Sequence, residues 1–464
     1  MLTADPSSAL GSATRDPLFT ALRDREFARL DEIGLAYLDY TGSALPAARQ
    51  FRSQEEILGR GVFGNPHADS APSRRSTAAL DEARALLLAH LDADDAEYTV
   101  CFTANATGAI KLVVESFPFS PNGSYVLTAD NHNSLNGARE YARRGGAHVA
   151  YVAVDDELRL VDAAPRLDDV SSKRGPKLFA FPAQSNFSGV RHPLDLIEVA
   201  QRRGFDVLLD AAAYLPSSPL SLRRHRPEFV ALSFYKLFGY PTGLGALVAR
   251  RDALGRLRRP WFAGGTVEYV SVQNDLHSLL PDGAAFEDGT PHFLGAAALS
   301  AGFSLLAEVG MARLSAHVAR LTNALLTGLG ALVHRDGSPA VCLYGPGDRG
   351  ARGGAAAFNV VAPDGRVVPY WIVEERAREL GVAVRGGCFC NPGAAEAAFG
   401  FEREAAAHCL RTAGRDGAFT VQRFASCMND RGDVAVGAVR ASLGLANNDA
   451  DVDRLIAVVE SFLN

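Results

Sequence analysis

The segment VALSFYKLFGYPTGLGALVAR (residues 230–250) contains an apolar run, a lysine, a Gly-rich turn and a second apolar run. The pattern predicts two buried strands joined by a turn, with Lys236 at the end of the first strand. The neighbours of Lys236 are aromatic or aliphatic, so its ammonium group would be poorly solvated. Desolvation lowers the pKa of a lysine and yields a nucleophilic amine suited to imine formation. From this segment alone, a lysine whose head reaches water is the commoner case.

The chain upstream of this segment alternates between apolar, β-rich runs and segments of helical period. This order favours an α/β fold with a largely parallel sheet covered by helices. The β-rich runs are TVCFT (99–103), SYVLTAD (124–130), AHVAYVAV (147–154), KLFAFPA (177–183) and DVLLDAA (206–212).

The pattern changes after Gly295. An apolar-periodic stretch over about 294–330 predicts one long helix, followed by short strands, a helix near 370–380 and a final helix near 449–462. Because 464 residues exceed one ordinary domain, we expect two lobes. The predicted division is an N-terminal arm (1–30), a large cofactor-binding domain (31–300) and a smaller C-terminal α/β domain (301–464).

Composition narrows the class of protein. The net charge is −6 and the Arg pairs are scattered, which is typical of solvated helix faces and not of a nucleic-acid surface. No run has the length of a signal peptide or a membrane span, so we expect a soluble, cytoplasmic protein with no membrane partner. The six cysteines are too sparse for a disulfide framework, and we expect their thiols to be reduced.

Several polar residues upstream of Lys236 match the needs of a pyridoxal phosphate (PLP) site. Asp210 closes the run FDVLLD and can keep a pyridine nitrogen protonated. Ala106 and Thr107 lie at a predicted helix N-terminus, where N–H and hydroxyl groups bind phosphate. Asn186 can bond the ring hydroxyl, and His132 can stack on the ring. Each residue alone has an ordinary structural explanation, such as helix capping, and it is their combination with Lys236 that predicts the cofactor.

With these residues in place, the chain resembles the cysteine desulfurase and class V aminotransferase branch of the fold-type I PLP enzymes, from about Tyr37 to the C-terminus. The sequence of the segments quoted below is similar to that of the N-terminal domain of molybdenum cofactor sulfurases. Since the sequence ends at Asn464, we expect no additional C-terminal domain. The segments that carry the resemblance are YLDYTGSALP (37–46), SNFSG (185–189), DAAA (210–213), SFYK (233–236), FEDGTPHFLG (286–295), RGGCFCNPG (385–393) and VRASLGLANNDADVDRL (439–455).

The resemblance implies a homodimer with a shared active site. It implies that Lys236 holds the cofactor as a Schiff base, Asp210 bonds its pyridine nitrogen, His132 stacks on the ring and Asn186 lies at the ring hydroxyl. The remaining implied cofactor contacts are Ala106, Thr107, Ser233, Tyr235 and Thr290 of the partner subunit. Two positions depart from the desulfurase pattern, because Ala213 replaces a Gln or His and Tyr235 replaces a His.

The sulfur-handling residues are implied by the same resemblance. Arg385 would hold the substrate carboxylate, and Cys390, five residues later, would take the sulfur. We expect Gly386, Gly387 and Gly393 to make this loop mobile, and the charge of Arg385 to favour the thiolate. Cys388 is the rival sulfur carrier. A metal site at the C-x-C pair is disfavoured because no second pair has zinc-type spacing. The two other residues assigned to substrate binding are Arg440 and His67.

We therefore predict a cysteine desulfurase-like sulfurtransferase that converts L-cysteine to alanine and leaves a persulfide on Cys390. The sulfur acceptor is not predicted. Two alternatives remain open. One is another PLP reaction on an amino acid, namely a β-lyase, an epimerase or an aminotransferase that does not use Cys390. The other is a PLP-binding sulfur-relay protein without turnover of free cysteine.

Overall fold

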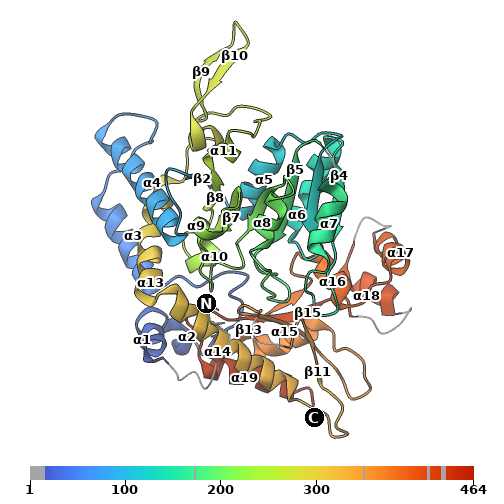
Figure 1. Cartoon of the computed structure of the whole chain (residues 1–464). Coiled ribbons are helices and arrows are strands. Elements are labelled where there is room, and N and C mark those ends of the chain that lie inside the picture. The colour runs from blue at the N-terminus through green and yellow to red at the C-terminus, as the bar shows by residue number, and fades with distance from the viewer. Residues whose placement is uncertain (1–15, 172–173, 348–350, 415–418, 430–434, 464) are drawn as a thin grey trace, which may run out of the picture.

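The computed structural model describes residues 16–171, 174–347, 351–414, 419–429 and 435–463. Its centre is a seven-stranded sheet in the order β2-β8-β7-β6-β5-β3-β4 (Figure 1). The five strands from β7 to β4 are parallel, and β8 is antiparallel to both of its neighbours. The predicted α/β fold is confirmed. The strands are β2 (Tyr98–Thr103), β3 (Ser124–Thr128), β4 (His148–Val152), β5 (Lys177–Pro182), β6 (Asp206–Asp210), β7 (Phe229–Ser233) and β8 (Gly245–Arg250).

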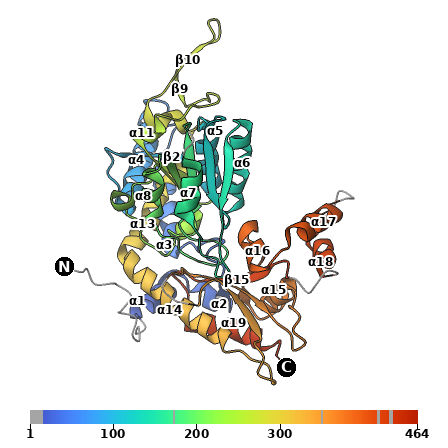
Figure 2. The ribbon, with the colours of Figure 1, turned by 45° about the vertical axis from the view of Figure 1, so that its right-hand side comes forward.

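Helices cover both faces of this sheet (Figure 2). Successive residues of one strand enter different cores: Phe179 and Phe181 of β5 belong to one buried cluster, Leu178 and Ala180 to another. This alternation is why the central strands are apolar along their whole length. The covering helices are α5 (Ala106–Ser116) and α6 (Asn133–Arg144) on one face, and α7 (Ala163–Ser171) and α8 (Leu196–Gln201) on the other.

A second, four-stranded antiparallel sheet lies in the C-terminal half, in the order β11-β12-β15-β14. The short β1 pairs with β13, so residues 36–37 lie beside residues 382–383. The domain boundaries given above stay a prediction. The elements of this half are β11 (Val341–Tyr344), β12 (Ala355–Val360), β13 (Val382–Ala383), β14 (Arg385–Gly387), β15 (Ala438–Ser442), α15 (Tyr370–Glu379), α16 (Pro392–Ala398), α17 (Arg403–Ala413), α18 (Val421–Asn429) and α19 (Asp449–Glu460), with β1 (Ala36–Tyr37) contributed from the N-terminal side.

The single long helix predicted over 294–330 is wrong. The stretch forms α12 (Phe293–Ala297), α13 (Leu299–Val309) and α14 (Met311–Gly330). Gly310 separates the last two with a φ of +78°, a left-handed conformation that suits glycine and ends a helix. In the described part of the chain no single helix is long and apolar enough to cross a membrane, although the pair across Gly310, bent by 74°, passes by length and composition.

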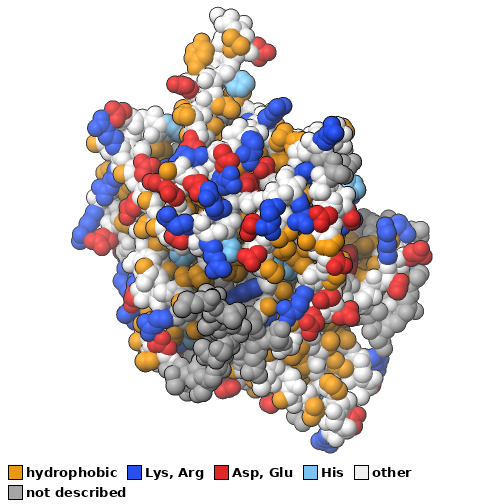
Figure 3. Space-filling model, viewed as in Figure 1, with side chains coloured by type: hydrophobic (Ala, Val, Ile, Leu, Met, Phe, Trp, Pro, Cys, Tyr) orange, Lys and Arg blue, Asp and Glu red, His pale blue; other side chains and the backbone are white. Residues whose placement is uncertain are grey.

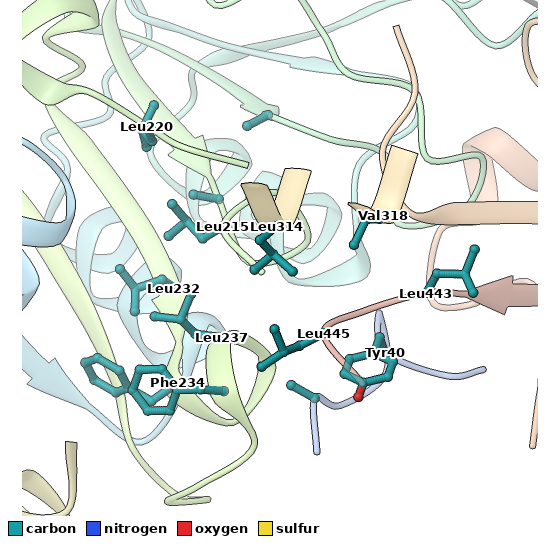
Figure 4. Packing of buried hydrophobic residues seen from close by; sticks show 14 of the residues in the cluster. Tyr40, Leu215, Leu220, Leu232, Phe234, Leu237, Leu314, Val318, Leu443 and Leu445 are labelled. Atoms are coloured by element: carbon teal, nitrogen blue, oxygen red, sulfur yellow. The ribbon is translucent and has the colours of Figure 1, made fainter. Parts of the chain in front are cut away.

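One buried cluster joins the two sheets. Figure 4 shows Phe234 and Leu237, on either side of the predicted catalytic lysine, in the same core as Leu314 of α14 and Leu445 after β15. Leu237, Leu314 and Leu445 also line one small cavity. The segment that carries Lys236 is therefore held by residues from both halves of the chain.

The expectation of reduced thiols is wrong at two positions, because Cys409 and Cys427 form a disulfide. Both lie on the neighbouring helices α17 and α18, where packing brings their Cα atoms to 5.5 Å, a separation that a disulfide spans. Sequence spacing cannot reveal this pairing, since it depends on how the two helices pack. The other four cysteines are free.

A hairpin of β9 (Val267–Ser271) and β10 (Leu276–Leu279) projects from the large sheet (Figure 1). It carries large apolar side chains in contact with solvent, among them Val272, Leu276 and Tyr269 with 94%, 64% and 62% of their surface exposed. Figure 3 shows apolar side chains on this hairpin, whereas positive and negative side chains are interspersed over the rest of that face.

The remaining elements are α1 (Pro17–Glu26), α2 (Arg29–Glu32), α3 (Ala48–Arg60), α4 (Ala71–His90), α9 (Leu222–His225), α10 (Phe234–Phe238), α11 (Arg251–Leu254) and the 3-10 helix η2 (Asp282–Phe286).

Candidate active site

A cavity of about 140 Å³ lies at the carboxyl ends of the parallel strands, which is where open α/β sheets bind ligands. It brings together eight residues assigned to the cofactor from the sequence. They are Ala106, Thr107, His132, Asn186, Asp210, Ser233, Tyr235 and Lys236.

Lys236 lies in the short helix α10, three residues after β7 ends at Ser233, and not at the strand end as predicted. It makes no hydrogen bond or ion pair with the described residues. Enclosure by protein lowers the pKa of the Lys236 ammonium, the carboxylate of Asp210 opposes this shift, and Arg440 adds to it. A lowered pKa leaves more of the amine neutral and nucleophilic.

Asp210 is the last residue of β6 and has 8% of its surface exposed. Its Oδ1 accepts a hydrogen bond from the backbone N–H of Ala212 at 3.0 Å. The carboxylate acts electrostatically on both Lys236 and His132. It is therefore a buried negative charge aimed at the cavity, as a protonated pyridine nitrogen requires.

The N-terminus of α5 forms an anion-binding corner of the cavity. The N–H of Ala106 donates to Ser233 Oγ at 2.8 Å, and Thr107 Oγ1 lies 2.7 Å from Ser134 Oγ. Three hydroxyl groups thus gather at the positive end of a helix dipole, an arrangement suited to a phosphate. Ser134 was not predicted, and only the fold brings it to Thr107.

His132 is the N-cap residue of α6, and its Nδ1 accepts a hydrogen bond from the N–H of Ser134 at 3.1 Å. Desolvation lowers the pKa of His132, while Asp210 raises it. The shift favours the neutral ring, which is suited to stacking on a flat heterocycle.

Gln184 lines the same cavity and was missed from the sequence. It is 2% exposed, its Oε1 is buried without a partner, and its side chain makes no hydrogen bond with the described residues. A side chain at Gly353 would collide with this amide, so the glycine leaves room for it. An unpaired buried amide costs free energy unless a ligand satisfies it. Ala213 has no polar group, whereas Gln184 supplies an amide at the cavity that can bond a ring oxygen.

Asn186 also lines the cavity, but its amide is engaged by the cysteine loop. Its Nδ2 donates to the carbonyl of Phe389 at 2.7 Å, and its Oδ1 accepts from Asn391 Nδ2 at 3.0 Å. Asn186 therefore connects the cofactor pocket to the residues on either side of Cys390. Its predicted contact with a ring hydroxyl stays a prediction.

Cys390 lies in this loop between β14 and α16, and it is exposed. Its carbonyl accepts a hydrogen bond from the N–H of Asn133 at 2.7 Å, beside His132. Cys390 and Phe389 have φ values of 58° and 55°, in the left-handed region that non-glycine residues rarely adopt. Cys388 is less accessible, and burial raises the pKa of its thiol to about 11. These differences favour Cys390 as the nucleophile.

The three glycines near Cys390 have defined structural roles. Gly386 and Gly387 lie in strand β14, paired with β15. A Cβ at Gly386 would collide with Tyr370 and Glu374, and one at Gly393 with the carbonyl of Ala129. Close approach of neighbouring groups therefore requires Gly386 and Gly393, whereas Gly387 is required by its backbone, which has a φ of +111°. These fixed roles differ from the predicted mobility of the loop.

Arg385 and Arg440 both bond Asp39, a residue to which the sequence analysis gave no role. Arg385 Nη2 lies 2.6 Å from Asp39 Oδ2, and Arg440 Nη2 lies 3.0 Å from Asp39 Oδ1. Both guanidinium groups act electrostatically on Lys236. The two predicted carboxylate ligands are thus beside the cofactor pocket.

His67 and Thr290 do not line this cavity. Both are exposed near the base of the β9–β10 hairpin, where Asn65 Nδ2 donates to Thr290 Oγ1 at 3.4 Å and His67 lies next to Gly265. Both residues therefore lie outside the pocket of this chain, and their predicted contacts with cofactor and substrate stay predictions.

A lysine of lowered pKa, a buried carboxylate, a flanking histidine and a helix N-terminus at one end of a parallel sheet define a PLP-dependent enzyme of fold type I. The sequence model of the aminotransferase class-V family matches residues 36–455, and the chain belongs to this family. The residues present fit PLP, including the unpaired amide of Gln184, and PLP is the cofactor.

Most of the chain is similar in sequence to molybdenum cofactor sulfurases. That of Anopheles gambiae is 37% identical over 466 residues, which cover 94% of this chain and 57% of that protein. That of Arabidopsis thaliana is 33% identical over 490 residues, covering 95% and 58%. The chain thus spans somewhat more than half the length of these relatives.

Solved structures of cysteine desulfurases share the fold. That of Thermococcus onnurineus has a TM-score of 0.77 at 23% identity and covers 98% of this chain and 99% of its own. A cysteine desulfurase of Escherichia coli has a TM-score of 0.75 at 22% identity and covers 97% and 99%.

Proposed function

We propose that the protein is a PLP-dependent cysteine desulfurase-like sulfurtransferase, which takes sulfur from L-cysteine, releases alanine and carries a persulfide on Cys390. The observation that carries the proposal is the hydrogen bonding of Asn186 and Asn133 to the Cys390 loop, which places an accessible thiol next to the lysine pocket. The similarity to molybdenum cofactor sulfurases over 94% of the chain supports the same chemistry.

Different residues of the pocket would hold different parts of the cofactor. Lys236 would supply the amine that attaches it, Asp210 would pair with the ring nitrogen, and Gln184 would bond a ring oxygen. The N-terminus of α5 with Thr107, Ser134 and Ser233 would hold the phosphate. When bound, PLP supplies an electron sink that allows bonds at the α- and β-carbons of an amino acid to break.

Lys236 and Cys390 carry out the steps at the substrate. The neutral amine of Lys236 removes the proton from the substrate Cα. The Cys390 thiolate then bonds to the substrate sulfur, and the Cβ–S bond breaks. The electron pair of that bond stays with carbon, which takes up a proton to give alanine, while the substrate sulfur remains on Cys390 as a persulfide. The active site needs no external oxidant or reductant for this exchange.

We further propose that the protein works as a homodimer. Thr290 and His67 lie outside the pocket of their own chain, and the projecting hairpin beside them exposes apolar side chains. Exposed apolar side chains that lie together on one hairpin favour burial against another surface. We propose that a second copy covers the hairpin and that Thr290 of the partner subunit reaches the phosphate.

The test of the function is the formation of alanine and sulfide from L-cysteine by the PLP-loaded protein, in the presence of a thiol reductant. We expect equal amounts of the two products. If pyruvate, ammonia and sulfide form in place of alanine and sulfide, the reaction is that of a β-lyase, and if the α-keto acid of cysteine forms with its sulfur retained, it is that of an aminotransferase; either result overturns the desulfurase proposal.

A further inference from the structure

Two arginines face each other beside the cofactor pocket. Arg385 of β14 and Arg440 of β15 are direct register partners on antiparallel strands. Like charges directly opposite one another destabilise a sheet, so this pair requires a counter-charge. Asp39 supplies it, with one oxygen 2.6 Å from Arg385 Nη2 and the other 3.0 Å from Arg440 Nη2. Within the described residues, Asp39 is the one carboxylate that bonds either guanidinium group.

The two arginines differ in what they can offer a ligand. The Arg440 side chain is 2% exposed. Its Nη1 donates to the carbonyl of Asn186 at 2.7 Å, and its guanidinium lies 4.7 Å from the centre of the Phe389 ring. Since its Nη2 bonds Asp39, both terminal nitrogens are already used.

Arg385, in contrast, has 49% of its side chain exposed. Its Nε and Nη2 donate to Asp39, and its Nη1 donates to no described residue. An incoming carboxylate can therefore reach Arg385, whereas Arg440 is fixed inside the protein. The backbone next to Asp39 is tied to the pocket as well, because the N–H of Ala44 donates to the carbonyl of Tyr235 at 3.1 Å.

We propose that Asp39 determines substrate specificity by setting the charge of this cluster. Within the hydrogen-bonded cluster, two guanidinium charges and one carboxylate leave a single positive charge, which one substrate carboxylate neutralises. Glu374 also acts electrostatically on Arg385, but its carboxylate bonds the N–H of Gly386 and not a guanidinium. A second carboxylate on the substrate would find no free positive charge in a partly desolvated site, and an unpaired charge there is costly. The site therefore accepts amino acids with one carboxylate and an uncharged side chain. This inference rests on the proposed function in taking Arg385 as the carboxylate ligand.

The test compares the binding of L-alanine and L-aspartate to the PLP-loaded enzyme by isothermal titration calorimetry at fixed ionic strength. The wild type should bind alanine more tightly. Asp39→Asn leaves a net charge of two, and we expect it to shift the ratio of the two affinities toward aspartate by at least tenfold. Adding Arg440→Gln to that variant restores a net charge of one and keeps Arg385, the guanidinium that a ligand can reach, so its ratio should lie within threefold of the wild type.

Two single variants complete the design. Arg385→Gln leaves no net charge, and we expect it to weaken alanine binding by at least tenfold. Asp364→Asn removes an exposed carboxylate that bonds Arg366 and makes no hydrogen bond or ion pair with the cluster among the described residues, and it should leave both affinities unchanged.

An unchanged affinity ratio in Asp39→Asn overturns the proposal, and so does a double variant that still prefers aspartate relative to the wild type. If Asp39→Asn does not fold, the double variant decides the question, because it keeps the wild-type charge without the wild-type carboxylate. The affinity ratios do not depend on turnover. A wild type that forms no alanine from cysteine but shows the expected ratios would therefore refute the desulfurase proposal and leave the role of Asp39 standing.

Discussion

Asn186 and Phe389 are joined by a hydrogen bond of 2.7 Å, from the side-chain amide of one to the backbone carbonyl of the other. The first follows strand β5 of the large sheet, and the second precedes Cys390 in the C-terminal half. Through this bond a pocket residue holds the loop that presents the thiol, with Cys390 in a left-handed conformation. The proposed nucleophile is therefore positioned by the cofactor-binding side of the molecule.

The first prediction concerns which cysteine takes the sulfur. Cys390→Ser should bind cysteine but form alanine at least 100-fold more slowly, because a serine hydroxyl stays protonated and is a poor nucleophile toward sulfur. Cys388→Ser should keep most of the activity, since burial raises the pKa of the Cys388 thiol to about 11. Intact mass after incubation with cysteine measures the added sulfur on each variant. A sulfur adduct that persists in Cys390→Ser and disappears in Cys388→Ser would assign the role to Cys388.

The second prediction is that Lys236→Ala abolishes covalent attachment of the cofactor. After borohydride reduction, the wild type should gain the mass of reduced PLP, and the variant should not. The matched control is Lys111→Ala, which removes an exposed lysine paired with Glu115. It should retain both the attachment and the turnover. Attachment that survives in Lys236→Ala would mean that another lysine holds the cofactor.

The third prediction tests the close packing next to the cysteine loop. Gly393→Ala would drive a methyl group into the carbonyl of Ala129, and we expect the unfolding free energy to fall by about 1–3 kcal/mol. Gly137→Ala, in the exposed middle of α6 with no atom near the new methyl group, should raise it by about 0.5–1 kcal/mol. Denaturant unfolding of both variants measures the difference. Equal effects of the two substitutions would show that Gly393 is not closely packed.

The fourth prediction concerns acid stability. Burial lowers the pKa of His317 to about 4, while its Nε2 lies 3.0 Å from the carbonyl of Asn447 and its ring stacks on Phe19. Below pH 6.5 the unfolded chain takes up a proton that folded His317 does not. The stability from this residue is therefore complete above about pH 6.5 and falls as the pH falls toward 4, by up to about 3 kcal/mol.

Urea unfolding between pH 7 and 4 checks this expectation. In His317→Gln the fall in the unfolding free energy over this range should be smaller than in the wild type by that amount. His148→Gln, at an exposed position of β4, serves as the control. A pH dependence that is the same in wild type and His317→Gln would contradict the prediction.

Local sequence patterns were sufficient for the strands of the large sheet and for most of the cofactor pocket. A strand buried on both faces is apolar along its length, and Asp210 and the α5 N-terminus follow directly from where such runs end. Lys236 was identified correctly as a member of the pocket, but in a helical turn beyond its strand. The shift arises because Phe234, Leu237 and Phe238 pack as a helix against residues far away in the chain, which no local pattern contains.

Contacts between distant segments account for what the sequence did not reveal. Asp39 meets Arg385 across 346 positions, and Gln184 fits its place because Gly353 has no side chain. The Cys409–Cys427 disulfide depends on the packing of α17 against α18. In each case the local sequence does not indicate the contact, because the partner residue is brought near only by the fold.

The shared core around α10 also bears on synthesis of the protein at the ribosome. Leu237 packs with Leu445, so the turn that holds Lys236 lacks part of its support until residues near the C-terminus have been made. A nascent chain that ends after the large sheet would have the lysine but not the finished pocket. Cofactor capture should accordingly be a late event, which follows synthesis of the segment around Leu445.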